Sequence, residues 1–349
     1  MKILDKKIIV NDLLRYAPFE TFYKCSDIEI NQILKFLLFV NENKEKITNS
    51  KFVQSNFWEK LSSARFTGVS NEYLLIKSAD RFTSSPSINY HFDTRFDNNL
   101  ITKINFMFRN FRVFINYYFR WNMHNLSLKI ELNRFEKIYK NFIKPNNHND
   151  FMHYYPVRYI DHLEIVQIID HDQKDTFLEI GPANCINVAL QISLRKIKKA
   201  YLIDLPEQIS FGYSFLKLFF KDTFKIGLPH EINRENIDDF DIVFLLPHQT
   251  DLIPDSKIDL AMNHSSFQEM KLDVVNNCIS IMEKKLRKGG QFISINQIET
   301  HYINDNNIDN WKLSNFEVKK LNPVFTNSRD LTLKIPKFKQ IVLNCILKN

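Results

Sequence analysis

Residues 176–206 decide how this chain folds; they begin TFLEIGPANC and end YLIDLP. Phe177–Ile180 is a short apolar run that stops at Gly181, which is typical of a buried strand ending in a tight turn. The next segment mixes apolar and polar residues as a short helix does, and Tyr201–Ile203 is a second apolar run that ends at Asp204. Strand, glycine turn, helix, strand and acidic residue is the order of parts in a mononucleotide-binding βαβ unit.

The glycine pattern of this turn argues against a dinucleotide ligand. A dinucleotide fingerprint needs Gly-x-Gly-x-x-Gly so that a pyrophosphate can sit on the helix N-terminus, whereas Gly181 is followed by Ala183 and no third glycine. Glu179 also places a carboxylate where a phosphate would approach. Both features suit a cationic amino-acid end, such as that of S-adenosylmethionine. Asp204 lies 25 positions after Glu179, where an acid can accept ribose hydroxyls.

Length and composition predict one or two domains with a sizeable core, because 44% of the 349 residues are hydrophobic. The four cysteines are scattered and form no CxxC pair, so neither a disulfide framework nor a zinc site is predicted. The N-terminus lacks the apolar core of a signal peptide, and no uncharged apolar run reaches about 18 residues. We therefore expect a cytoplasmic protein without a transmembrane segment.

The positive charge is concentrated in one segment. Residues 101–144 carry nine Lys or Arg against two Glu, a difference that equals the whole net charge of +7. Within it, residues 103–121 follow a helical pattern with aromatic side chains on one face and basic ones on another. One interpretation is a platform for bases, sugars or an anionic membrane surface; the other is a core helix with a solvated basic face.

The first 149 residues are predicted to form a mainly helical accessory domain. Ser26 and Glu29 have the spacing of a capping box, and apolar residues at helical spacing follow, so we predict a helix over 27–43. Shorter helices are predicted over 50–63 and 71–79. The polar, proline-containing segment 144–150 is the predicted boundary with a second domain over 150–349.

The second domain continues as alternating strands and helices. A helix over 161–169 precedes the first strand, and Pro206 suits the first turn of the helix over 209–220. A later helix is expected to stop at Gly289-Gly290, with glycine as its left-handed cap. The further predicted strands cover 241–246, 258–262, 291–295, 316–325 and 339–347.

Four blocks give the chain a family likeness: EIGPA at 179–183, IDLPE at 203–207, NHSSFQEM at 263–270 and LRKGG at 286–290. With these blocks in this order, residues 150–349 resemble a class I S-adenosylmethionine-dependent methyltransferase, and more narrowly the sugar O-methyltransferase family. The resemblance implies an α/β Rossmann-like methyltransferase sheet, mostly parallel with an antiparallel C-terminal strand, beside the N-terminal helical domain. The chain departs from the superfamily at Ala183 and Cys185, where glycines are usual.

The resemblance also implies roles for individual residues. The methionine part of the cofactor would be held by the turn, Asp204 would accept the ribose hydroxyls, and Leu205 would lie against adenine. Asp204 has an alternative role as a helix N-cap before Pro206. The other implied cofactor contacts are Glu179, Gly181, Pro182, Ala183 and Asn184 in the turn, Leu246, Pro247 and His248 beside adenine, and Asn263 at the fourth strand. His248 has an alternative role as a strand end in solvent.

The acceptor side has three candidate catalytic residues. Methyl transfer to a hydroxyl needs alignment and is helped by a base, and strand ends in an open α/β sheet point into the ligand crevice. His264 follows the fourth strand, His301 follows the fifth, and Glu269 begins the next helix. Candidate substrate contacts are Tyr154, Tyr155, Arg158 and Ser266. Each of these residues has an ordinary packing or polar role as its alternative.

The implied activity is transfer of a methyl group to a sugar hydroxyl, in surface polysaccharide or glycoconjugate biosynthesis. The alternatives are a degenerate methyltransferase fold that binds a partner, or a methyltransferase acting on nucleic acid or another small molecule. The block at 263–266 is not the Asn/Asp-Pro-Pro-aromatic motif of base methylation, so no nucleic-acid partner is expected. No metal is predicted, because Asp251, Asp255 and Asp259 lie in a loop broken by Pro254. Peripheral membrane contact and homo-oligomers stay open.

Overall fold

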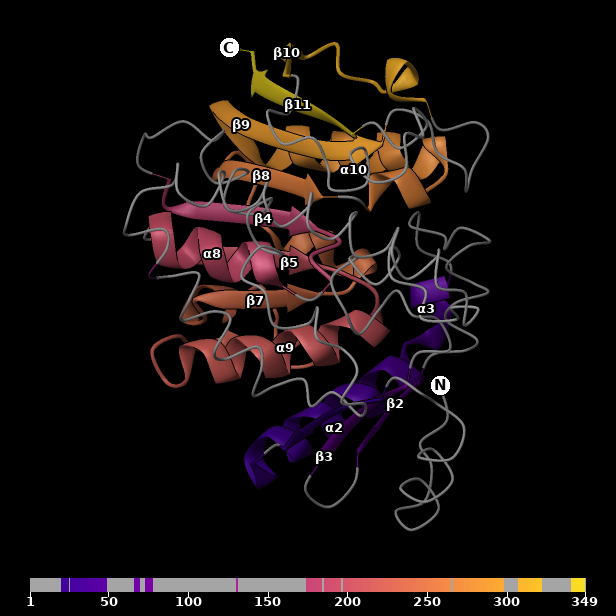
Figure 1. The fold of residues 1–349 in the computed structure, drawn as a ribbon, viewed down its shortest axis with the longest axis vertical. Helices are drawn as coiled ribbons and strands as arrows, with labels where there is room; N and C mark the ends of the chain where they lie inside the picture. The colour runs from indigo at the N-terminus through magenta and orange to yellow at the C-terminus, as the bar shows by residue number, and fades with distance from the viewer. Residues whose placement is uncertain are drawn as a thin grey trace, which may run out of the picture.

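The structure is a computed structural model of the whole chain (Figure 1). It describes residues 20–24, 26–48, 66–69, 73–77, 130, 174–183, 185–195, 197–264, 266–297, 307–321 and 340–348. Among these residues no helix is long and apolar enough to cross a membrane.

An eight-stranded sheet is the centre of the fold, in the order β10-β11-β9-β8-β4-β5-β7-β6. Its strands are β4 (Thr176–Ile180), β5 (Lys199–Ile203), β6 (Ile226–Gly227), β7 (Ile242–Leu245), β8 (Ile258–His264), β9 (Leu286–Gln297), β10 (Phe316–Leu321) and β11 (Gln340–Leu347). In this spatial order, every neighbouring pair from β9 to β6 is parallel, including the pairs of β4 and β5. The strand β11 runs antiparallel to both β9 and β10. The predicted Rossmann-like sheet, mostly parallel with an antiparallel C-terminal strand, is confirmed.

The sheet reverses its winding direction at β4. From β4 the chain passes through α8 (Ile186–Arg195) to β5 on one side, and β8 later pairs with β4 on the other side. In an open α/β sheet, ligands bind outside the carboxyl ends of the strands at such a switch point. The turn after β4 therefore lies where a ligand site is expected.

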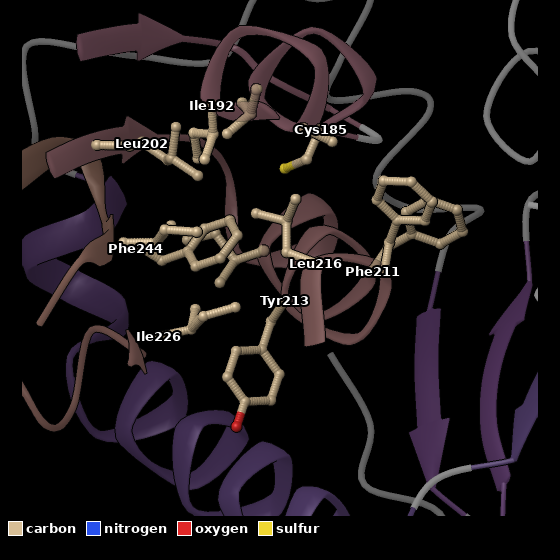
Figure 2. Packing of buried hydrophobic residues seen from close by; sticks show 14 of the residues in the cluster. Cys185, Ile192, Leu202, Phe211, Tyr213, Leu216, Ile226 and Phe244 are labelled. Carbon is tan, nitrogen blue, oxygen red and sulfur yellow. The ribbon is translucent and has the colours of Figure 1, made fainter. Parts of the chain in front are cut away.

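The sheet is covered on both faces. Successive residues of a strand point to opposite faces, so each strand contributes side chains to two cores. Phe177, Leu202 and Phe244 belong to one core, together with α8 and α9 (Pro206–Phe220). Figure 2 shows this core, in which Cys185 and Leu216 lie among aliphatic and aromatic side chains. The alternate strand residues form the other core with α10 (Leu272–Lys285). Strands buried on both faces explain the continuous apolar runs of the sequence.

The N-terminal helix α2 (Asp27–Glu42) packs on this domain. Its predicted capping box is confirmed: Ser26 Oγ accepts from the Glu29 N–H, and the Ser26 N–H donates to Glu29 Oε2 at 2.7 Å. The buried face of α2 joins the same core as α9. In Figures 1 and 2 the indigo α2 runs beside α9, and Tyr213 points toward it. The short helix α3 (Lys44–Thr48) follows.

One helix predicted in the N-terminal half is wrong. Tyr73–Lys77 of the predicted helix 71–79 is strand β3, which lies between β1 (Glu20–Lys24) and β2 (Phe66–Val69) in an antiparallel sheet. Its sequence YLLIK is a short apolar run, which periodicity alone cannot assign to helix or strand. Pairing on both sides, with the neighbouring β2 and with β1 about fifty residues earlier in the sequence, makes this segment a strand.

The predicted glycine cap of α10 is also wrong. The helix ends at Lys285, and Gly289, with a φ of 69°, lies inside β9. Two carbonyls of the last turn, those of Lys284 and Lys285, accept from the N–H groups of Ser256 and Lys257 at 3.1 and 2.9 Å. Because this loop satisfies carbonyls that a glycine cap would satisfy, the helix ends without one. Gly289 instead serves a register shift between β8 and β9.

Several predictions fall on residues that the structure does not describe. These are the helices over 50–63, 103–121 and 161–169 and the domain boundary at 144–150. The division into domains of 1–149 and 150–349 stays a prediction.

Candidate functional site

The turn after β4 is built from residues in left-handed backbone conformations. Gly181, Ala183 and Cys185 have φ values of 73°, 47° and 58°. The Gly181 N–H donates to the Ile203 carbonyl at 2.8 Å, which joins the turn to the end of β5. A side chain at Gly181 has no space, because a Cβ atom there would lie 2.6 Å from the Ser266 Cβ atom. The chain therefore needs glycine at 181 for both conformation and space.

Asp204 holds this turn from the end of β5. Its Oδ2 atom accepts from the Ala183 N–H at 2.8 Å, and its Oδ1 atom accepts from the Leu205 N–H at 2.7 Å. The N-cap of α9 is Leu205, so Asp204 is not the helix cap that the sequence left open. The half-buried carboxylate lies beside the turn, at the strand end where an acid binds ribose hydroxyls in nucleotide sites.

Glu179 brings a carboxyl group into the interior directly before the turn. It is 1% exposed, and its Oε2 atom has no hydrogen-bond partner among the residues that the structure describes. Burial raises the pKa of Glu179 to about 8; a hydrogen bond from Asn187 lowers it, and the nearby Asp204 raises it. A buried carboxylate with an unpartnered oxygen is costly unless a charge meets it. A cationic ligand would supply that charge.

The end of β8 is fixed by buried amides. Asn263 is fully buried; its Nδ2 atom donates to the Ile180 carbonyl at 2.8 Å and also to the Ser266 Oγ atom. Its Oδ1 atom accepts from Asn296 Nδ2 at 2.9 Å. Asn296 in turn accepts from the Gln268 N–H at 3.1 Å. These bonds join β4, β8 and β9, so Asn263 shapes the site from inside.

The sequence did not single out Asn296 or Asn187. Asn296 lies on β9, and Asn187 lies in the first turn of α8, where its Nδ2 atom is 3.0 Å from the His264 Nδ1 atom. Both partners are distant in sequence, and an Asn within an apolar segment carries no local pattern that marks such a contact. His264 itself ends β8 and is half-buried, as the sequence placed it.

The segment after β7 is more buried than the alternative role of His248, a strand end in solvent, would require. Leu246 and Pro247 are buried, and the half-buried His248 lies in the short helix η5 (Pro247–Leu252). Burial and the charge of Lys46 on α3 lower the pKa of His248. His248 therefore does not simply end a strand in solvent.

The structure thus joins many of the predicted site residues around one turn. Hydrogen bonds or close contacts connect Gly181, Ala183, Asp204, Asn263 and Ser266, and Asn187 connects Glu179 to His264. Pro182 is buried within the turn, and the half-buried Glu269 ends helix η6 (Phe267–Glu269). The predicted site residues outside the described part of the chain are Asn184, Tyr154, Tyr155, Arg158 and His301.

Two of the three aspartates considered for a metal, Asp255 and Asp259, serve the scaffold, and Asp259 lies on β8 and not in a loop. Asp255 pairs with the buried Lys285 at 2.6 Å, and Asp259 accepts from the Thr176 N–H at 3.0 Å and pairs with Arg287. Among the residues that the structure describes, no group of His, Cys, Asp and Glu is arranged to hold a metal ion.

Comparisons with known proteins find likeness among solved structures. A geranyl diphosphate methyltransferase in complex with geranyl diphosphate and sinefungin is 13% identical, with a TM-score of 0.40, over 58% of this chain and 84% of the other. The geranyl diphosphate C-methyltransferase of Streptomyces coelicolor A3(2) is 13% identical, with a TM-score of 0.37, over 54% and 78%. Phospholethanolamine N-methyltransferase 2 of Haemonchus contortus is 12% identical, with a TM-score of 0.37, over 62% and 56%. No protein-family model and no curated protein matches the chain.

Proposed function

We propose that this protein is an S-adenosylmethionine-dependent methyltransferase that transfers a methyl group to a sugar hydroxyl. One observation carries the proposal: Glu179 and Asp204 lie at the ends of adjacent parallel strands, on either side of a left-handed glycine turn. Glu179 offers a cation a buried carboxylate oxygen that has no partner in the described part of the chain, and Asp204 offers a half-buried carboxylate at the ribose position. A ligand with a cationic amino-acid end and a ribose matches this pair.

The other residues of the turn would complete the cofactor site. Glu179 and the turn would hold the methionine end, and Asp204 the ribose, with Leu205 against adenine. Asn263, with its amide bonded inside the protein, would position the turn from below. The remaining proposed cofactor contacts are Gly181, Pro182, Ala183, Asn184, Leu246, Pro247 and His248.

Methyl transfer to an oxygen is an in-line displacement, so the protein's main task is to align the acceptor. The bound cofactor supplies the electrophilic methyl group. His264, Glu269 and His301 are the proposed groups on the acceptor side, and one of them would take the hydroxyl proton as the new bond forms. The histidines titrate near neutral pH without special arrangement.

The acceptor class rests on the resemblance of the sequence to sugar O-methyltransferases. Tyr154, Tyr155, Arg158 and Ser266 are the proposed acceptor contacts, and the pathway would be the assembly of a surface polysaccharide or glycoconjugate. Mass spectrometry of surface glycans from cells with and without the gene tests this directly. Loss of a 14-Da methyl increment from one sugar would support the proposal, and identical glycans would contradict it.

Calorimetric titration tests the cofactor apart from the acceptor. The full chain is titrated with S-adenosylmethionine, with S-adenosylhomocysteine and with NAD. Binding of the first two alone supports the proposal. No binding of any of them would favour a degenerate fold that binds a partner, to which the alanine at 183 points, and binding of NAD alone would indicate an oxidoreductase.

Replacing Asp204 by alanine is expected to weaken S-adenosylmethionine binding by about 1.5–3 kcal/mol, the contribution of hydrogen bonds to a charged group. The change also removes the acceptor for the Ala183 N–H. Asp204→Asn keeps the shape of the side chain without its charge, and Asp222→Ala, at an exposed residue of a turn, is the matched control. Calorimetry gives the affinities; unchanged affinity in both Asp204 variants would refute the ribose assignment.

Replacing His264 by alanine is expected to slow methyl transfer about 10²-fold or more and to leave cofactor affinity nearly intact. The reason is that His264 lies at the end of β8, on the proposed acceptor side, and Asn187 stands between it and the cofactor side. Single-turnover rates, with the acceptor that the glycan analysis identifies, give the chemical step. A wild-type rate in this variant would mean that His264 has no part in the chemical step, and would leave His301 and Glu269 as the acceptor-side groups.

A further inference from the structure

Asn187 lies between the two halves of the proposed site. Its side chain is buried in the first turn of α8. The amide donates a hydrogen bond to Glu179, on the cofactor side. The same amide nitrogen is 3.0 Å from the Nδ1 atom of His264, on the acceptor side.

One amide group can serve both neighbours, because an asparagine nitrogen carries two hydrogens. An imidazole nitrogen that faces an N–H donor must present its lone pair. With Nδ1 as the acceptor, the neutral ring of His264 therefore carries its hydrogen on Nε2. The contact thus selects one of the two neutral forms of the histidine.

We propose that Asn187 is a positioning residue that joins Glu179 to His264 and holds His264 in its Nε2–H form. The catalytic meaning of this inference rests on the proposed function, but the tautomer itself does not. In the Nε2–H form, the Nε2 atom already carries a hydrogen and cannot take the proton of an acceptor hydroxyl. His264 becomes a base at Nε2 only when Asn187 turns its amide and Oδ1 accepts from an Nδ1–H group.

The turned amide has a consequence for the cofactor side. It presents oxygen in place of nitrogen to Glu179, which favours the protonated carboxyl group over the carboxylate. With its oxygen toward both neighbours, Asn187 therefore stabilises a hydrogen on His264 Nδ1 and a hydrogen on Glu179 together. With its nitrogen toward them, Asn187 disfavours both hydrogens. Through this single side chain, the charge state beside the cofactor selects the form of the histidine beside the acceptor. With Glu179 as the carboxylate, His264 would donate from Nε2 and orient the acceptor oxygen, and the hydroxyl proton would pass to Glu269 or His301.

Nitrogen-15 NMR of the histidine rings tests the proposal without any acceptor. The full chain is labelled at histidine, and the His264 signals are assigned by their loss in His264→Gln. We expect the Nε2–H form in the wild-type protein at a pH above the pKa of Glu179. In Asn187→Asp a carboxylate faces Nδ1 and accepts from it, so the ratio of Nε2–H to Nδ1–H forms should fall by at least about tenfold. Asn310→Asp, the same change at an exposed residue, should leave the ratio unchanged.

A second variant covers the case in which Asn187→Asp does not fold. Asn187→Ala removes the donor, and the wild-type preference for the Nε2–H form should then be lost. At a pH above the pKa of Glu179, an Nδ1–H form in the wild-type protein, or the wild-type ratio in the folded Asn187 variants, would overturn the proposal. Titration of the same samples with S-adenosylhomocysteine keeps the two ideas apart: a protein that binds none of it contradicts the proposed function, while the tautomer ratios still decide the role of Asn187.

Discussion

Gly181→Ala is expected to destabilise the protein by about 2–4 kcal/mol and to abolish measurable cofactor binding. The left-handed φ of 73° is costly for a residue with a Cβ atom, and that atom would lie 2.6 Å from the Ser266 Cβ atom. Relief of the overlap must move Ser266, and with it the bonds to Asn263 and the Ile180 carbonyl that hold the turn. Denaturant unfolding gives the stability, and calorimetry with S-adenosylmethionine gives the affinity.

Gly289→Ala is the matched control, because Gly289 has nearly the same φ, 69°, but its added Cβ atom would meet nothing within 4 Å. This variant carries the backbone strain without the overlap, so a loss of about 1–2 kcal/mol with normal cofactor affinity is expected. If both variants lose the same stability and both keep the cofactor, the contact with Ser266 does not control the turn.

The βαβ unit could be predicted from sequence because its signals are local. The apolar runs of β4 and β5 end at Gly181 and Asp204, and the structure places the strand ends there. The later strands were recognised for the same reason. What the patterns alone could not give was the strand order, which depends on pairing between distant segments. The expected strand directions, mostly parallel with an antiparallel C-terminal strand, came from the family resemblance.

The predictions that failed concern features decided by tertiary contact. Tyr73–Lys77 is a strand because it pairs with two other segments, and α10 ends without a glycine cap because a distant loop meets its carbonyls. Asn187 escaped notice for a related reason: its partner His264 lies 77 positions away, and the two meet because β4, which precedes α8, pairs with β8, which ends at His264. Residue types in the sequence indicate candidate site residues, but the hydrogen bonds in the folded protein show which of these residues contact one another.

The affinity for S-adenosylmethionine is expected to rise with pH up to about 8 through Glu179. Burial raises the pKa of this carboxyl to about 8, so the free protein binds a proton there at neutral pH. A cationic ligand selects the carboxylate and must displace that proton. Binding should therefore strengthen by about tenfold per pH unit below the pKa and then level off, with up to one proton released per ligand bound. Calorimetry in buffers of different ionisation enthalpy measures both quantities.

Glu179→Gln is the control that isolates this carboxyl, because glutamine keeps the shape and cannot ionise. The variant should bind S-adenosylmethionine weakly, and its affinity should lack the pH dependence that Glu179 causes. Because the ligand's own amino group titrates in the same way with both proteins, the difference between the two pH profiles isolates the contribution of Glu179.

The same pair of proteins tests the linkage to stability. A raised pKa in the folded state favours folding below the unfolded value of 4.5, and this contribution is lost as the pH rises through about 8. The variant should therefore gain stability relative to the wild type over that range when no ligand is bound. Parallel pH profiles for the two proteins, in affinity and in stability, would mean that Glu179 does not meet the cation.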